Sequence, residues 1–156
     1  MTQPTSQPTH DKALVGAAGE HYVAFRLSAE GYAVGLTARG TTALDLLVAN
    51  PRTGSSITIQ TKTATNAWVA SRKWGNYWKW RIGSKRLSPS GSFFYVLLNL
   101  RDDPSGAPAA LIVPSTQLGP LLETFGTGRP DVWCTIYEKD KAQYLERWDL
   151  ITAVLG

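Results

Sequence analysis

Hydrophobic positions near the start of the chain recur at the spacing of a helix. Five apolar side chains are separated alternately by three and four residues: Val15, Ala18, Tyr22, Phe25 and Ala29. Such spacing places them on one face of an amphipathic helix. Gly31 follows where a left-handed cap residue commonly ends a helix. The pattern therefore predicts a helix that packs through this face and ends just before Gly31.

Short apolar runs bounded by turn residues predict the strands. A short strand is expected over 32–37 and a buried strand over 44–49. The turn Asn50-Pro51-Arg52-Thr53-Gly54 leads into a third strand over 56–63, where apolar and polar side chains alternate. The second and third of these strands are expected to form a hairpin.

The second half of the chain predicts two further strands and two helices. Apolar strands are expected over 93–100 and 109–114, joined by a turn over 102–106. Ser115 is a candidate cap for a short helix through Phe125, and apolar residues spaced by three predict a closing helix over 139–148. Residues 64–91 carry no clear period, and 68–80 is compatible with either helix or loop.

The order of these elements indicates an α/β fold. A helix, three strands, a variable segment, two strands and closing helices form a central mixed β-sheet flanked by α-helices. The 156 residues suit one domain over 12–156, preceded by a flexible polar tail over 1–11 that is rich in Thr, Gln and Pro. No internal repeat is present.

Composition describes an ordinary globular protein. Hydrophobic residues make up 43% and charged residues 18% of the chain, which excludes a disordered polyelectrolyte. The single cysteine, Cys134, excludes an internal disulfide and is interpreted as a small buried hydrophobe. Neither a secretory signal nor an apolar run of about 20 residues is present, so we expect a cytoplasmic protein without a membrane partner.

The basic residues are concentrated in the middle of the chain. The net charge is only +4, but no acidic residue occurs between Asp45 and Asp102, where nine basic residues lie. Such a stretch produces a local positive potential larger than the net charge suggests, which favours a polyanionic partner.

Aromatic side chains are interleaved with these cations. Cations that meet phosphates and rings on which bases stack are the components of a nucleic-acid surface. Nine residues are candidates for it: Arg72, Lys73, Trp74, Trp78, Lys79, Trp80, Arg81, Lys85 and Arg86. The alternative is that Trp78 and Trp80 pack inward while the basic residues form a solvated face.

The expected hairpin brings polar side chains together. If Ala49 faces Ser56, then Asp45 faces Gln60, and Lys62 projects from the same face two residues further on. A carboxylate and an amide oxygen suit Mg²⁺, a hard cation that keeps several waters. The ammonium of Lys62 could then orient water and offset charge that develops on a phosphate. A structural hydrogen-bonding role for Asp45 and a solvent-facing edge strand for Gln60 and Lys62 are the alternatives.

These residues resemble a known nuclease motif. The pattern consists of the run Leu44-Asp45-Leu46-Leu47-Val48, a gap of 15 from Asp45 to Gln60, and the triplet Gln60-Thr61-Lys62. It is similar to the motif of the PD-(D/E)XK, or restriction-endonuclease-like, superfamily. The helix bearing Gly19-Glu20 resembles the one that supplies an extra glutamate in resolvase-like members. The resemblance covers about residues 12–114.

The resemblance implies a restriction-endonuclease-like core and assigns roles to four side chains. Asp45 would be the main metal ligand, Gln60 a second ligand, Lys62 the catalytic lysine, and Glu20 a further ligand or a water-orienting group. The implied cofactor is Mg²⁺, with Mn²⁺ as a substitute. Leu44 stands where proline is common, and Gln60 replaces an acidic residue as in Mrr-like enzymes, which removes one negative charge from the site.

The sequence therefore supports two candidate functions. The first is a metal-dependent nucleic-acid phosphodiesterase, with DNA as the expected substrate. The second is a nuclease-like fold with little or no catalysis that acts as a nucleic-acid-binding or protein-interaction module. The sequence leaves open whether the chain forms a homodimer, as many enzymes of the resembled type do.

Overall fold

The computed structural model describes residues 11–38, 43–100, 106–128 and 131–156. The expected tail over 1–11 lies outside these residues except for Asp11, which caps the first helix. The helices are α1 (Lys12–Ala29) and α2 (Asp149–Leu155), with 3-10 helices η1 (Ser115–Gln117), η2 (Gly119–Leu121) and η3 (Glu138–Gln143). The strands are β1 (Ala33–Leu36), β2 (Leu46–Ala49), β3 (Ser56–Ala64), β4 (Trp68–Val69), β5 (Tyr77–Arg81), β6 (Phe93–Asn99), β7 (Ala109–Pro114), β8 (Leu122–Phe125) and β9 (Asp131–Tyr137).

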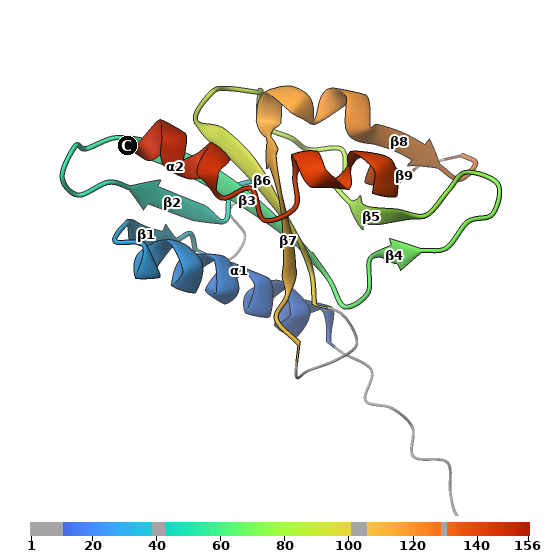
Figure 1. Ribbon diagram of the computed structural model, residues 1–156, viewed down its shortest axis with the longest axis horizontal. Helices are drawn as coiled ribbons and strands as arrows, with labels where there is room; N and C mark the ends of the chain where they lie inside the picture. The colour runs from blue at the N-terminus through green and yellow to red at the C-terminus, as the bar shows by residue number, and fades with distance from the viewer. Residues whose placement is uncertain (1–10, 39–42, 101–105, 129–130) are drawn as a thin grey trace, which may run out of the picture.

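A five-stranded sheet, here sheet A, forms the centre of the molecule (Figure 1). Its order is β1-β2-β3-β6-β7, in which β3 and β6 are parallel and the other neighbours are antiparallel. The expected mixed sheet is therefore confirmed, and so are the helix before it and the five strands that build it.

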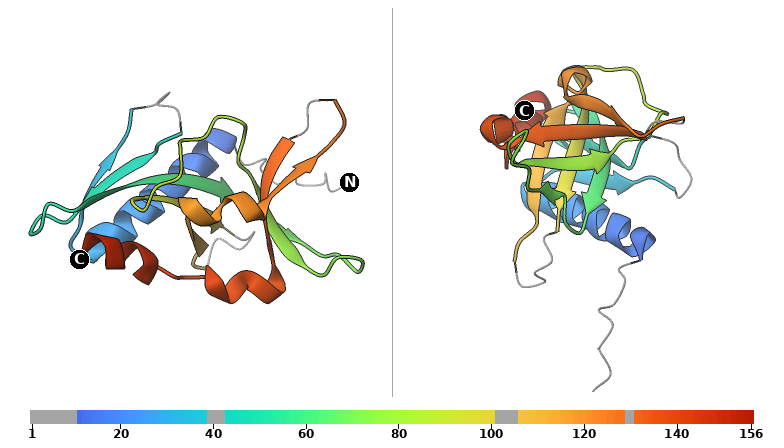
Figure 2. Two further views of the ribbon diagram at one scale, coloured as in Figure 1. Left: turned by 90° about the horizontal axis from the view of Figure 1, so that it is seen from above. Right: turned by 90° about the vertical axis from the view of Figure 1, so that its right-hand side faces the viewer.

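A second, four-stranded sheet, here sheet B, was not anticipated. Its order is β4-β5-β9-β8, entirely antiparallel, and its strands cross those of sheet A (Figure 2). The unassigned segment over 64–91 contributes β4 and β5. The strand β9 was not predicted.

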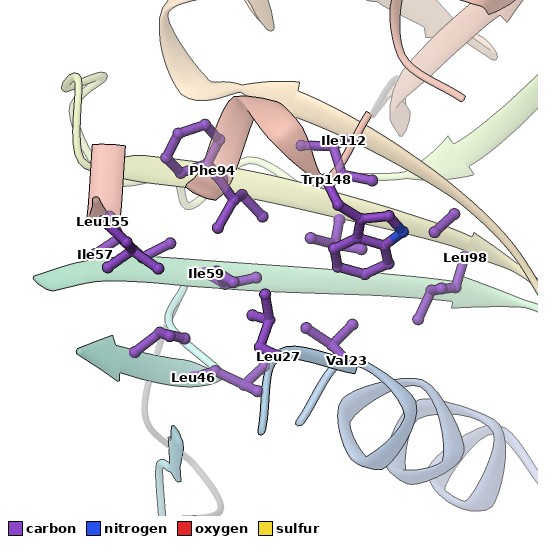
Figure 3. Close-up of a cluster of buried hydrophobic side chains, with 14 residues drawn as sticks. Val23, Leu27, Leu46, Ile57, Ile59, Phe94, Leu98, Ile112, Trp148 and Leu155 are labelled. Atoms are coloured by element: carbon purple, nitrogen blue, oxygen red, sulfur yellow. The ribbon is translucent and has the colours of Figure 1, made fainter. Parts of the chain in front are cut away.

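Sheet A separates two hydrophobic cores. On one face, α1 and α2 pack against Ile57, Ile59 and Phe94 through Val23, Leu27 and their neighbours (Figure 3). On the other face, side chains of β6 and β7 pack against sheet B. This second core contains Phe93, Tyr95, Leu97, Leu111, Val113, Trp80, Ile82, Cys134 and Ile136. Burial raises the pKa of Cys134 to about 12, so its thiol is neutral at ordinary pH, as expected for a small buried hydrophobe.

The buried face of α1 differs from the expected one. Gly19, Val23 and Leu27 are buried, whereas Phe25 is 67% exposed. The reason is close packing, because an added Cβ on Gly19 would overlap the Thr63 hydroxyl and lie 3.0 Å from Leu98 Cδ1. A helix can approach a sheet this closely only through a residue without a side chain. The predicted end is confirmed, since α1 stops at Ala29 and Gly31 has a φ of +94°.

The two later helices were predicted at the wrong places. Residues 115–125 form η1, η2 and the strand β8 instead of one helix. Residues 139–148 complete η3 and then form a segment that pairs with β7, the edge strand of sheet A. The Ile112 N–H donates to the Tyr144 carbonyl, and the Ala110 N–H donates to the Glu146 carboxylate. These bonds satisfy an unpaired strand edge, which outweighs local helix propensity. The closing helix is α2, over 149–155.

Among the described residues, no helix is both long enough and apolar enough to cross a membrane.

Candidate active site and basic groove

The β2–β3 hairpin positions the predicted motif. Its register places Ala49 opposite Ser56 and Leu47 opposite Thr58, as expected. The pairing then departs from a regular ladder, because Leu46 lies opposite Ile59 and the N–H of Asp45 also donates to the Ile59 carbonyl at 3.0 Å. Two successive residues thus face one residue, which is the arrangement of a β-bulge.

The bulge turns the Asp45 carboxylate toward Thr61 and away from the predicted partner, Gln60. Asp45 Oδ2 accepts hydrogen bonds from the Thr61 N–H at 2.7 Å and from the Thr61 hydroxyl at 3.1 Å. Thr61 alternates with Gln60 and Lys62 along β3, so it belongs to the opposite face of the sheet. The expected direct pairing of Asp45 with Gln60 is therefore wrong. Asp45 Oδ1 has no hydrogen-bond partner among the described residues.

Gln60 lies inside the protein. It pairs with Tyr95 of β6, and its side chain points to the core that sheet B covers. The residue is only 5% exposed, and its Oε1 atom is buried without a hydrogen-bond partner in the described part of the chain. A buried acceptor without a donor costs about 1–3 kcal/mol, so this oxygen is available to a cation or a water.

Lys62 lies where two surface hollows meet. The first is lined by Arg81, Ile82, Gly83, Ser84, Asp131 and Val132 as well as Lys62. The second lies between the start of α1, the end of β3 and sheet B, and it includes Lys12, Lys79, Arg81 and Trp133. We call the two hollows together the basic groove. The proposed catalytic lysine is thus half-buried and borders hollows that are also lined by Lys12, Lys79 and Arg81.

Glu20 lies on α1 beside the close contact that Gly19 makes with β3. Its side chain is half-buried. The position keeps Glu20 near the sheet, because Val23 and Leu27, which follow it on the same side of α1, pack into the core.

The structure brings together only part of the predicted nucleic-acid set. Lys79 and Arg81 line the basic groove with Lys62. Arg72, Lys73 and Trp74 are exposed in the connection between β4 and β5. Lys85 and Arg86 are exposed in the connection from β5 to β6.

Trp78 and Trp80 differ from the stacking platforms that were predicted. Trp80 is 2% exposed within the second core, and its indole N–H donates to the Leu98 carbonyl at 2.9 Å. Its ring faces are covered, so a base cannot stack on them. Trp78 is half-buried, contacts Trp68 edge-on at 4.7 Å, and has Lys141 Nζ over its ring. The inward-packing alternative is thus correct for Trp80.

Three residues of the basic groove were missed by sequence reasoning. In the sequence, nothing distinguishes Lys12 from an ordinary first residue of a helix. Asp131 and Trp133 belong to the strand β9, which was not predicted. The run over 132–137, which is rich in β-branched and aromatic residues, was the available signal for that strand.

The residues of the β2–β3 hairpin suit magnesium in donor type. Asp45 Oδ1 and Gln60 Oε1 are hard oxygen donors that have no hydrogen-bond partner among the residues that the structure describes. Within the described ranges no three or more His, Cys, Asp and Glu residues gather as a metal site. Mg²⁺ commonly uses one or two protein carboxylates and completes its shell with water, so these donor types suit the ion. The two side chains leave opposite faces of the hairpin, however, and do not converge on one position.

Comparison with known proteins finds one structural relationship. No protein-family model matches the chain, and no curated protein matches it. Among solved structures, it is similar to the bacterial homing endonuclease I-Ssp6803I, with a TM-score of 0.56 and 15% sequence identity. The similarity covers 94% of this chain and 95% of that chain. The protein therefore shares the fold of a bacterial homing endonuclease over nearly its whole length.

Proposed function

We propose that the protein is a metal-dependent nucleic-acid phosphodiesterase that acts as a DNA endonuclease. The observation that carries the proposal is the fold shared with a homing endonuclease across almost the entire chain. The motif residues support it, because Lys62 opens into a groove lined by further cations. A phosphodiester backbone is the substrate that such a groove attracts most strongly.

The roles follow the PD-(D/E)XK resemblance, with a restriction-endonuclease-like core. By that resemblance Asp45 and Gln60 would hold Mg²⁺, or Mn²⁺ in its place, which requires the Asp45 carboxylate to leave Thr61 and turn toward Gln60. Glu20 would add a ligand or orient water. The ion supplies charge neutralisation at phosphorus and a more acidic bound water. Lys62 places an ammonium beside the phosphate and stabilises the negative charge that grows there.

The second candidate is a nucleic-acid-binding module that does not cut. One observation favours it: both hydrogen bonds of the Asp45 carboxylate go to Thr61, so the side chain already has a structural use. In that case the basic groove would serve binding alone.

A cleavage assay separates the two candidates. Labelled single-stranded, duplex and branched DNA would be incubated with wild type and with Asp45→Asn or Lys62→Met, with Mg²⁺ or Mn²⁺. The endonuclease proposal expects metal-dependent cutting, lowered by about 100-fold or more in each variant, which is the scale of one charge-stabilising group. Asp45→Asn is preferred to alanine because it keeps an acceptor for Thr61.

The matched control is Lys139→Met, which removes an exposed lysine outside the basic groove. Cutting should survive in this variant. Salt-sensitive DNA binding by wild type without cutting under any metal condition would instead establish the binding module.

A further inference from the structure

The basic groove contains more cations than one reacting phosphate requires. Lys62 is common to both of its hollows, and so is Arg81. The hollow nearer α1 adds Lys12 and Lys79. The positive surface is therefore continuous on both sides of Lys62.

The hollow nearer α1 has the size and the walls of a ligand-binding pocket. It spans about 500 Å³, within the roughly 300–1,000 Å³ typical of ligand sites. Three separate parts of the fold enclose it: the first turn of α1, the end of β3 and the outer face of sheet B. On that face Arg81 lies directly opposite Trp133, so a cation and a ring project together.

The cations in this hollow are poorly neutralised. Among the described residues, Lys12, Lys62 and Lys79 form no salt bridge, and Arg81 is paired with Asp131 at 2.6 Å. Lys79 instead lies over the rings of Trp133 at 4.7 Å and Phe125 at 5.2 Å. These contacts hold its ammonium in place without cancelling its charge.

Lys12 occupies a position that folding alone disfavours. It is the first residue of α1, directly after the N-cap Asp11, and the first turn itself contains no acidic residue. The positive end of the helix dipole repels a cation there by a few tenths of a kcal/mol. A bound anion would remove this penalty and use the helix dipole as well.

We infer that this hollow binds the nucleic-acid backbone next to the phosphate that is cut, with Lys12, Lys79 and Arg81 contacting phosphates and Trp133 contacting the sugar or base. The inference rests on the proposed function for its substrate class. A strand of linked phosphates fits better than a small anion, because a small anion would occupy one hollow only. Cations interleaved with a ring are also what backbone and base together require.

The test is binding without cutting. Fluorescence anisotropy with a labelled DNA oligonucleotide, single-stranded or duplex, would be measured in EDTA for wild type, Lys12→Glu, Lys12→Ala and Lys12→Arg. Lys12→Glu should raise Kd by about tenfold, and Lys12→Ala should reduce the slope of log K against log salt by about 1. Lys12→Arg should bind as wild type does.

Misfolding does not account for such a loss. An acidic residue in the first turn favours the helix, so Lys12→Glu should have a Tm equal to or above that of wild type. The matched control is Arg52→Glu, which makes the same charge reversal at an exposed turn before β3. Equal Kd values for Lys12→Glu and Arg52→Glu would overturn the inference.

The experiments distinguish a failure of the endonuclease proposal from a failure of the backbone-site inference. Binding that depends on Lys12 in a protein that never cuts DNA would overturn the endonuclease and leave the backbone site. Cutting that depends on Lys62, with binding indifferent to Lys12, would overturn the backbone site alone. Absence of any DNA binding would overturn both.

Discussion

The carboxylate of Asp45 takes part in the hydrogen bonding of the sheet before any ligand arrives. Its bonds to Thr61 predict different outcomes for two substitutions. Asp45→Ala leaves the N–H of Thr61, a residue only 7% exposed, without an acceptor and should cost about 1–3 kcal/mol of unfolding free energy. Asp45→Asn keeps an acceptor and should cost clearly less. Urea unfolding measures both.

The two variants should nevertheless lose cleavage equally, because neither retains a carboxylate for the metal. Thr61→Val is a useful comparison, since it removes the hydroxyl donor at 3.1 Å and leaves the backbone donor intact. An Asp45→Asn variant that cuts at the wild-type rate would limit Asp45 to its structural role.

Gln60 provides a second prediction at the residue scale. Gln60→Glu restores the acidic residue of the usual motif, but it buries a charge, which costs on the order of several kcal/mol without a partner. Burial should raise the pKa of the new carboxyl, so the loss of stability should be small in acid and grow as the pH rises to neutrality. Mn²⁺ should reverse it, as thermal unfolding with and without the ion would reveal.

Gln60→Met is the matched control, because it keeps the approximate shape and removes the unpartnered oxygen. It should be at least as stable as wild type and less responsive to Mn²⁺. A Tm of Gln60→Glu that Mn²⁺ leaves unchanged would mean that residue 60 is not a metal ligand.

At the scale of elements, the contact between α1 and β3 depends on Gly19. Gly19→Ala would overlap Thr63 and push α1 from the sheet, at a cost of about 1–3 kcal/mol. Gly16 lies one turn earlier with no atom within 4 Å of an added Cβ, so Gly16→Ala should stabilise the helix by about 0.5–1 kcal/mol. Chemical denaturation of the pair measures the difference; equal effects would contradict the close contact.

Elements with a strong local pattern could be predicted from the sequence. The strands β6 and β7 are continuous apolar runs bounded by turn residues, and α1 has a clear helical period. Its buried face could not be predicted, because apolar residues occur around most of the helix and a glycine decides the contact. The helix predicted over 139–148 was wrong for a related reason, because the backbone partners of this segment lie on β7, far away in the sequence.

The sequence predicted which residues belong to the candidate site, but it did not predict how their side chains are arranged. Counting back along a regular hairpin gave the correct partners as far as Leu47 and Thr58. The bulge at Asp45 then changed the orientation of one side chain, and no local signal in the sequence indicates an extra residue there. Lys62 could be placed on its strand, but its basic surroundings depend on sheet B.

At the scale of the whole molecule, the net charge of +4 conceals an uneven distribution. Because four cations, Lys12, Lys62, Lys79 and Arg81, line the groove, DNA binding should weaken steeply with salt, with a slope of log K against log salt near −0.9 for each phosphate neutralised. Titrations at several salt concentrations give that number. Binding that is insensitive to salt would exclude the groove as the contact surface.

The ion pair between Arg81 and Asp131 also means that a ligand must displace a carboxylate before it can bind Arg81. A covalently attached carboxylate acts at a high effective concentration, so a lone phosphate in solution competes poorly for this arginine. A polymer held at neighbouring lysines presents its next phosphate at a comparable effective concentration and can displace the carboxylate. If the groove binds nucleic acid as proposed, this internal counter-ion would favour long polyanions over the small phosphates of a cell.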